Sequence, residues 1–213
     1  VPTSMKDIFL TRGWPTLRGS RSIDPDQAWD VDAPVTARLR ADGMVLVGKN
    51  TTPEIAWKGV TDSPLTGVTR NPVDPRMTAG GSSGGASAVV AAGMAPVAVG
   101  TDAGGSIRIP ASFCGIVGFK PTHGRVPMFP ASPFGPLAHA GPMTRTVDDA
   151  ALLLDVISQP DPRDPTALDV PPTPFREQAT RDVSGLHVAY SGTLGWIDVD
   201  DEVARVCDAA VAA

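Results

Sequence analysis

Residues 80–110 read GGSSGGASAVVAAGMAPVAVGTDAGGSIRIP, and this stretch decides the fold class. Between its two glycine-rich loops, the alanine- and valine-rich residues 84–94 predict a buried helix, and residues 96–99 predict a strand. A second, short helix is expected over 107–112, after the second loop. Strands and helices that alternate with glycine turns are typical of an α/β layered domain.

The sequence on either side continues this alternation. A helix is predicted over 33–43, with Asp32 as its cap and Gly43 at its end, and a buried strand follows over 44–47. An amphipathic helix is predicted over 147–157, capped by Thr146. A further strand is predicted over 186–190, and a helical pattern runs from 200 to 213. The proline-rich stretches 127–142 and 159–185 are expected to be long loops.

Each glycine-rich loop carries a serine that could take part in catalysis. Ser82 lies in Gly80-Gly81-Ser82-Ser83-Gly84-Gly85, and Ser106 follows Gly104-Gly105. Glycines let the backbone approach a ligand closely and let successive N–H groups point at one developing negative charge. With Lys6 near the start of the chain, these serines are the parts of a Ser–Ser–Lys acyl-transfer site. Taken alone, each has an ordinary structural reading: a helix cap for Ser106, a flexible turn for Ser82 and a solvated Lys6–Asp7 pair.

These segments resemble the amidase signature family over about residues 1–157. The two serines are 24 residues apart, as in that family, and six segments carry the resemblance: residues 1–7, 48–54, 80–85, 100–110, 113–122 and 141–147. The resemblance implies a mixed, mostly parallel central sheet covered by helices on both faces. Because family members are much longer, we expect residues 1–213 to be part of a single domain whose N- and C-terminal parts are missing.

The resemblance also implies a role for each residue of the site. Ser106 is the expected nucleophile, and Ser82, after a cis peptide bond, is expected to pass a proton between Ser106 and Lys6. The backbone N–H groups of Ala103, Gly104, Gly105 and Ser106 are the expected oxyanion hole. Lys6 must be neutral to act as the base, so it needs a dry pocket and Asp7 must point away from it.

Asp102 and Arg108 flank the nucleophile. We expect both to support the loop, with an ordinary ion pair or turn as an equally good reading.

The sequence says less about the substrate. Four side chains in or beside the loop 127–142 could form an apolar acyl pocket: Phe129, Phe134, Leu137 and His139. A proline-rich surface loop would contain the same residues.

The predicted function is hydrolysis of a small-molecule carboxylic amide to an acid and ammonia or an amine, through a Ser106 acyl-enzyme. The alternatives are the glutaminase subunit of a tRNA-dependent amidotransferase and a catalytically inactive binding domain. The net charge of −5 argues against nucleic acid or a membrane surface as the main partner. Cys114 and Cys207 indicate reduced thiols and a cytoplasmic protein, and no metal or organic cofactor is implied. A homodimer is left open.

Overall fold

The computed structural model describes residues 1–213 and contains a five-stranded mixed sheet. β1 (Pro2–Lys6) pairs in parallel with β2 (Val45–Asn50) and with β5 (Val97–Asp102). β7 (His139–Thr144) runs antiparallel to both β5 and β6 (Val117–Gly118). Four strands therefore point the same way and only β7 is reversed, which confirms the mostly parallel sheet.

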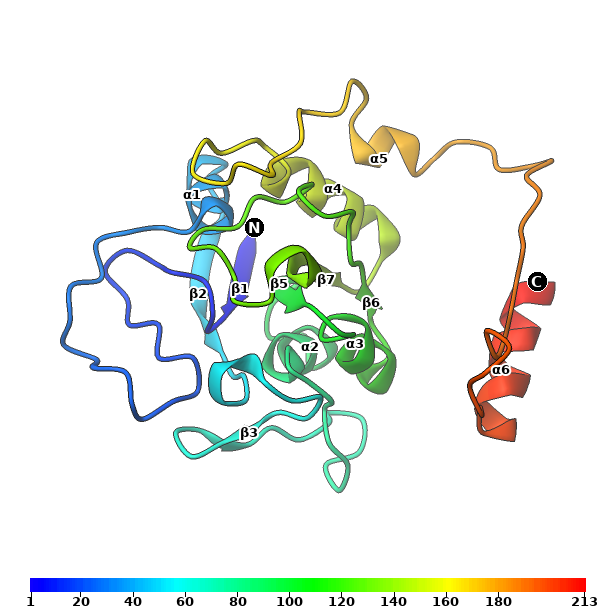
Figure 1. Cartoon of the computed structure of the whole chain (residues 1–213), viewed down its shortest axis with the longest axis horizontal. Coiled ribbons are helices and arrows are strands. Elements are labelled where there is room, and N and C mark those ends of the chain that lie inside the picture. The colour runs from blue at the N-terminus through cyan, green and yellow to red at the C-terminus, as the bar shows by residue number, and fades with distance from the viewer. The chain divides into compact units, whose positions relative to one another are not determined.

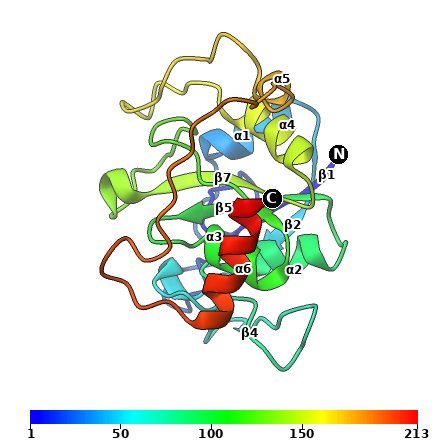
Figure 2. The same cartoon turned by 90° about the vertical axis from the view of Figure 1, so that its right-hand side faces the viewer.

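Helices cover both faces of this sheet, as Figures 1 and 2 show. On one face, Val97 and Val99 of β5 pack with α1 (Pro34–Ala41) and α4 (Val147–Ile157). On the other face, Ala98 packs with α2 (Gly84–Ala91) and α3 (Arg108–Cys114). Because side chains alternate along a strand, one apolar strand serves two separate cores, and the predicted layered fold is confirmed.

Short elements connect these layers. They are the 3-10 turns η1 (Glu54–Ala56) and η2 (Gly135–Leu137), the hairpin strands β3 (Asp62–Ser63) and β4 (Gly67–Val68), and the four-residue helix α5 (Phe175–Gln178).

One predicted helix cap is confirmed and one is wrong. The Thr146 hydroxyl accepts a hydrogen bond from the Asp149 N–H at the start of α4. Asp32 does not cap α1, whose N-cap is Ala33. Its carboxylate instead accepts bonds from the Arg40 side chain and the Arg12 N–H, so it ties α1 to the segment before it.

Two strand predictions also need correction. Residues 139–142, the end of the expected loop, belong to β7, although Gly141 and Pro142 are poor strand formers. The strand forms because β5 pairs with it along its whole length. Residues 186–190 form no strand, because no strand lies beside them and their side chains are exposed.

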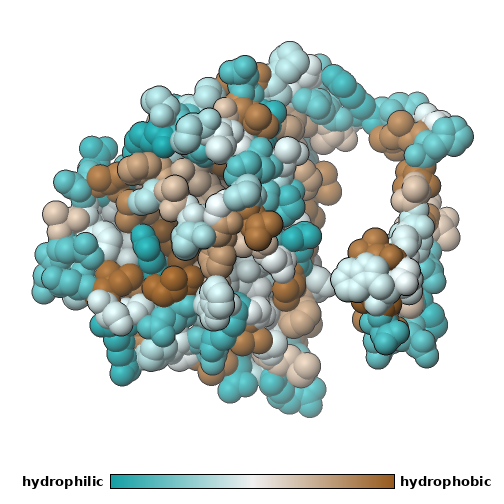
Figure 3. Space-filling model, in the orientation of Figure 1, coloured by the Kyte–Doolittle hydropathy of each residue, from teal (hydrophilic) through white to brown (hydrophobic).

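Residues Arg181–Ala213 form a second unit, separate from Val1–Thr180. This unit contains α6 (Asp201–Ala212), whose first turn is capped by the Asp200 carboxylate. It exposes several apolar side chains, among them Val188 and Trp196, and brown side chains are visible on it in Figure 3. Neither α6 nor any other helix has the length and apolar character needed to cross a bilayer.

Candidate active site

The ends of two parallel strands bring the expected catalytic residues together. Lys6 is the last residue of β1, and Thr101 and Asp102 end the neighbouring strand β5. The carboxyl ends of adjacent parallel strands meet at one edge, where α/β proteins commonly bind ligands. Gly100 lets the loop before α2 approach this edge, because a Cβ there would lie 2.9 Å from Ser83 Oγ.

Lys6 is fully buried, and its amine contacts three hydroxyl groups. Lys6 Nζ lies 2.7 Å from Ser82 Oγ, 3.0 Å from Ser83 Oγ and 2.8 Å from Thr101 Oγ1. Burial lowers the pKa of Lys6 well below its usual 10.5, although the Asp102 charge opposes this shift. None of its hydrogen-bond partners is charged, so the surroundings favour the neutral amine.

Ser83 has a defined place in this hydroxyl cluster. Its own hydroxyl proton goes to the Thr101 carbonyl, 3.0 Å away, so Ser83 must accept the hydrogen bond from Lys6. The Ser83 N–H donates to the Ser106 carbonyl at 3.1 Å and joins the two glycine-rich loops. The peptide bond Gly81-Ser82 is cis, as the resemblance implies.

Asp7 is held away from the Lys6 amine. Its carboxylate forms an ion pair with Lys49 Nζ at 3.1 Å. Lys49 also donates to the Phe9 carbonyl and to Thr16 Oγ1, and both fix its position. The Asp7 carboxylate therefore pairs with Lys49 and not with Lys6, and the cluster around Lys6 contains no carboxylate.

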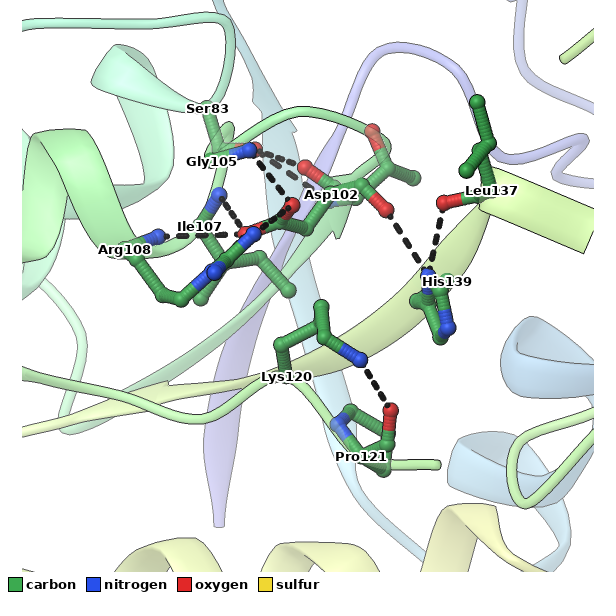
Figure 4. A network of polar contacts seen from close by, with 10 residues as sticks. Ser83, Asp102, Gly105, Ile107, Arg108, Lys120, Pro121, Leu137 and His139 are labelled. Atoms are coloured by element: carbon green, nitrogen blue, oxygen red, sulfur yellow. Dashed lines mark hydrogen bonds and ion pairs between the residues drawn. The ribbon is translucent and has the colours of Figure 1, made fainter. Parts of the chain in front are cut away.

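Asp102 organises the loop that carries Ser106 (Figure 4). Its carboxylate accepts hydrogen bonds from the Gly105 and Ile107 N–H groups and pairs with the Arg108 guanidinium at 2.9 Å. Burial of Asp102 acts to raise its pKa, but these donors outweigh that effect and lower the pKa to about 2. Asp102 and Arg108 therefore support the loop as expected. They form an ion pair, and Asp102 also accepts hydrogen bonds from amides of the turn.

Ser106 lies in the turn just before α3 and is partly exposed. It lines the same cavity as Ser82 and Thr101. Lys6, Ser82 and Ser106 thus lie at one site. The Lys6 amine is hydrogen-bonded to Ser82, but no hydrogen bond joins the Ser82 and Ser106 side chains.

The expected oxyanion hole needs one correction. The Gly105 N–H donates to the Asp102 carboxylate at 2.7 Å, so it is not free to bind a substrate oxygen. The N–H groups of Ala103, Gly104 and Ser106 form no such bond. These three amides have no acceptor within the protein, and their role as an oxyanion hole stays a prediction.

The cavity has a volume of about 160 Å³, which is enough for a small organic group. Two of the four expected substrate contacts, Phe129 and Phe134, line it, and Phe134 stacks on Trp57 at its edge. The other two are placed elsewhere. Leu137 is 61% exposed. His139 is the first residue of β7, and its Nδ1 is hydrogen-bonded to the carbonyls of Asp102 and Leu137 (Figure 4).

The sequence reasoning missed several lining residues. They come from the segment after β1, from η1 and from the loop before η2: Ile8, Phe9, Arg18, Ile55, Ala56 and Met128. Thr101 was also missed as a partner of Lys6. The sequence could have indicated Thr101, because it lies near the end of a predicted strand and directly before Asp102.

Known proteins are similar to this chain over its whole length. The Amidase family model matches residues 1–213. An acylamidase of Rhodococcus erythropolis is 46% identical over 100% of this chain and 45% of the relative's length. A glutamyl-tRNA(Gln) amidotransferase subunit of Burkholderia vietnamiensis is 40% identical over 99% of this chain and 45% of its own.

Solved structures give the same result. A bacterial aryl acylamidase, described as an amidase signature enzyme, superimposes with a TM-score of 0.90 and 38% identity, covering 99% of this chain and 44% of its own. A 6-aminohexanoate cyclic dimer hydrolase superimposes with a TM-score of 0.91 and 37% identity, covering 100% of this chain and 46% of its own. The chain thus spans about half the length of the relatives it matches.

Proposed function

Since the chain belongs to the amidase signature family, we propose that the protein hydrolyses carboxylic amides with Ser106 as nucleophile and a Ser82–Lys6 proton relay. One observation carries the proposal. A buried lysine lies 2.7 Å from a serine hydroxyl and has no carboxylate partner, beside a cavity that also contains Ser106. A structural lysine would be paired or would reach water.

The proposed reaction has two halves. Ser106 Oγ attacks the amide carbonyl, its proton passes to Ser82 Oγ, and the Ser82 proton passes to Lys6 Nζ. The carbonyl oxygen, now negative, accepts hydrogen bonds from the amides of Ala103, Gly104 and Ser106. The proton returns along the relay to the leaving nitrogen, and ammonia or an amine departs. Water then attacks the acyl-enzyme by the same route, and the acid is released.

The relay depends on a neutral Lys6. An ordinary lysine is protonated at neutral pH and has no lone pair to accept a proton. Burial lowers the pKa of Lys6, and Asp7, which could oppose this, is paired with Lys49. The mainly apolar cavity wall supports the same effect, because apolar surroundings disfavour the charged amine.

Replacement of Ser106 tests the proposal. Ser106→Ala in the full-length protein should abolish amide hydrolysis and labelling by a fluorophosphonate probe, while circular dichroism and the thermal transition stay those of wild type. Ser184→Ala is the matched control, since this exposed hydroxyl bonds to Asp182 in the second unit and does not line the cavity. A Ser106→Ala protein that keeps a tenth or more of wild-type activity rules out this nucleophile.

The amidotransferase relatives favour a second function, glutamine hydrolysis that delivers ammonia to a partner protein. Glutaminase activity that appears only with such a partner would identify it. An inactive binding domain would instead show no fluorophosphonate labelling of the full-length protein. The cytoplasmic location and the homodimer stay predictions.

A further inference from the structure

Arg18 lines the same cavity as the proposed nucleophile, and its guanidinium has no partner in the protein. Ser82, Ser106 and Arg18 contribute to the same cavity wall. Several other arginines, such as Arg40, Arg108 and Arg163, form ion pairs with carboxylates. The Arg18 side chain forms neither an ion pair nor a hydrogen bond, although it is only partly exposed. A guanidinium in that position keeps all five N–H donors for a ligand.

No other charge in the cavity is available to a ligand. The second ionised residue of the wall is Asp102, which is 1% exposed and has both carboxylate oxygens occupied by Arg108 and loop amides. Lys6 is buried behind Ser82, with its pKa lowered by burial. The rest of the wall is mainly apolar, with Phe9, Met128, Phe129 and Phe134 among its larger side chains. The cavity therefore combines one free positive charge with apolar walls.

The backbone holds Arg18 in this position. Its φ is 54°, in the left-handed region that non-glycine residues seldom adopt, and its carbonyl accepts the Ile55 N–H at 2.8 Å. Ile55 and Ala56, which line the same cavity, also have positive φ, at 54° and 60°. Gly19 packs so closely that a Cβ there would lie 2.5 Å from the Thr52 carbonyl oxygen. Strained backbone of this kind is concentrated at binding sites.

We propose that Arg18 binds a carboxylate of the substrate, so that the protein acts on amides whose acyl or amine part ends in a carboxylate. This inference rests on the proposed function. A guanidinium fork matches a carboxylate with two parallel hydrogen bonds, and the bond is strong where the walls exclude water. An apolar spacer between the carboxylate and the scissile amide would contact the aromatic and methionine side chains of the wall.

Two matched substrate pairs test this with the full-length protein. Glutaric acid mono-4-nitroanilide and pentanoic acid 4-nitroanilide differ by a carboxylate on the acyl side. 4-Acetamidobenzoate and 4-acetamidotoluene differ by a carboxylate on the amine side. The readout is the ratio of kcat/KM for the anionic member to that for the neutral member, which is insensitive to a general loss of activity.

We expect wild type to prefer the anionic member of at least one pair. Arg18→Met should lower that ratio about 10- to 100-fold, the size expected for a charge-assisted hydrogen bond, and Arg18→Lys should lose less. Methionine keeps an unbranched side chain, so the left-handed backbone is no more strained than before. Arg76→Met is the control and should leave the ratio unchanged, since Arg76 pairs with Asp74 on the surface.

A binding measurement separates this inference from the proposed function. Calorimetry with the Ser106→Ala protein should show glutaric acid mono-4-nitroanilide binding that Arg18→Met weakens about tenfold or more. If that result holds and no amide is hydrolysed, the proposed function fails and the carboxylate site stands. If neutral amides are hydrolysed as well as anionic ones by wild type, the carboxylate site is wrong and the proposed function stands, whatever the Arg18 variants do.

Discussion

Thr101→Val should impair catalysis through the orientation of the Lys6 amine. A neutral amine has two N–H donors and one lone pair, and Lys6 Nζ has three hydroxyl neighbours. Ser83 must take one N–H, because its own proton goes to the Thr101 carbonyl. If Thr101 Oγ1 accepts the second N–H, the lone pair is left facing Ser82, as the relay requires.

Valine keeps the shape of threonine and removes this acceptor. One Lys6 N–H then lacks a partner in a fully buried site, and this penalty grows as the amine takes up the proton in the transition state. An increase of about 1–3 kcal/mol would lower kcat/KM about 5- to 150-fold. The amine can now also turn an N–H toward Ser82, which blocks proton transfer. The ammonium loses a partner as well and suffers more from it, so the kinetic pKa of Lys6 should fall together with the plateau rate.

The assay is kcat/KM against pH, with the rate of fluorophosphonate labelling as a second readout. Thr101→Ser keeps the hydroxyl and should stay close to wild type. Thr144→Val is the structural control: Thr144 is buried and bonds to the Thr146 carbonyl, away from the site, so stability should fall without a change in the pH profile. Thr101→Val activity within about twofold of wild type, with the same kinetic pKa, would refute the orientation argument.

Three further results are expected. Lys6→Ala combined with Ser82→Ala should lose little more kcat than either single change, because both act in one relay, and multiplicative losses would exclude the relay. Since burial lowers the pKa of Lys6, kcat/KM should rise with pH to a plateau reached well below 10.5, and Lys6→Arg should be almost inactive; a flat profile with rate-limiting chemistry would contradict Lys6 as the base. The pKa of Asp102 falls from 3.8 to about 2 on folding, so its ionised form stabilises the fold by about 2–3 kcal/mol above pH 4 and loses this effect as the pH falls through 2. Urea unfolding of wild type and Asp102→Asn should therefore converge between pH 4 and pH 2, and a constant difference would contradict the assignment.

Much of the fold followed from local signals. The glycine loops, the apolar helix of residues 84–91 and the Thr146 cap are local features of the sequence, and all three form as expected. β7 was missed because its Gly141 and Pro142 disfavour a strand, and only pairing with β5 makes it one. The 186–190 segment had strand-like residues and no neighbouring strand to pair with.

In the candidate site, too, some residues follow from local sequence motifs and others only from the folded chain. Local motifs predict Lys6, Ser82 and Ser106, whereas the contact between Lys6 and Thr101 depends on how β1 and β5 lie side by side. The sequence does not reveal that the Gly105 N–H donates to the Asp102 carboxylate, because this contact depends on the fold of the loop. Arg18 carries no motif, and only the folded chain shows that its guanidinium reaches the cavity without a partner.

The burial of Lys6 has a consequence for folding itself. In the unfolded chain this amine is protonated up to about pH 10.5, whereas in the folded chain it loses its proton at a lower pH. Between these two values the unfolded chain holds the extra proton, so folding releases it to the solvent and the free energy of unfolding rises with pH. The heat of refolding should then depend on the ionisation enthalpy of the buffer. Near neutral pH, the burial of Lys6 therefore lowers the stability of the folded chain, and this cost accompanies its lowered pKa.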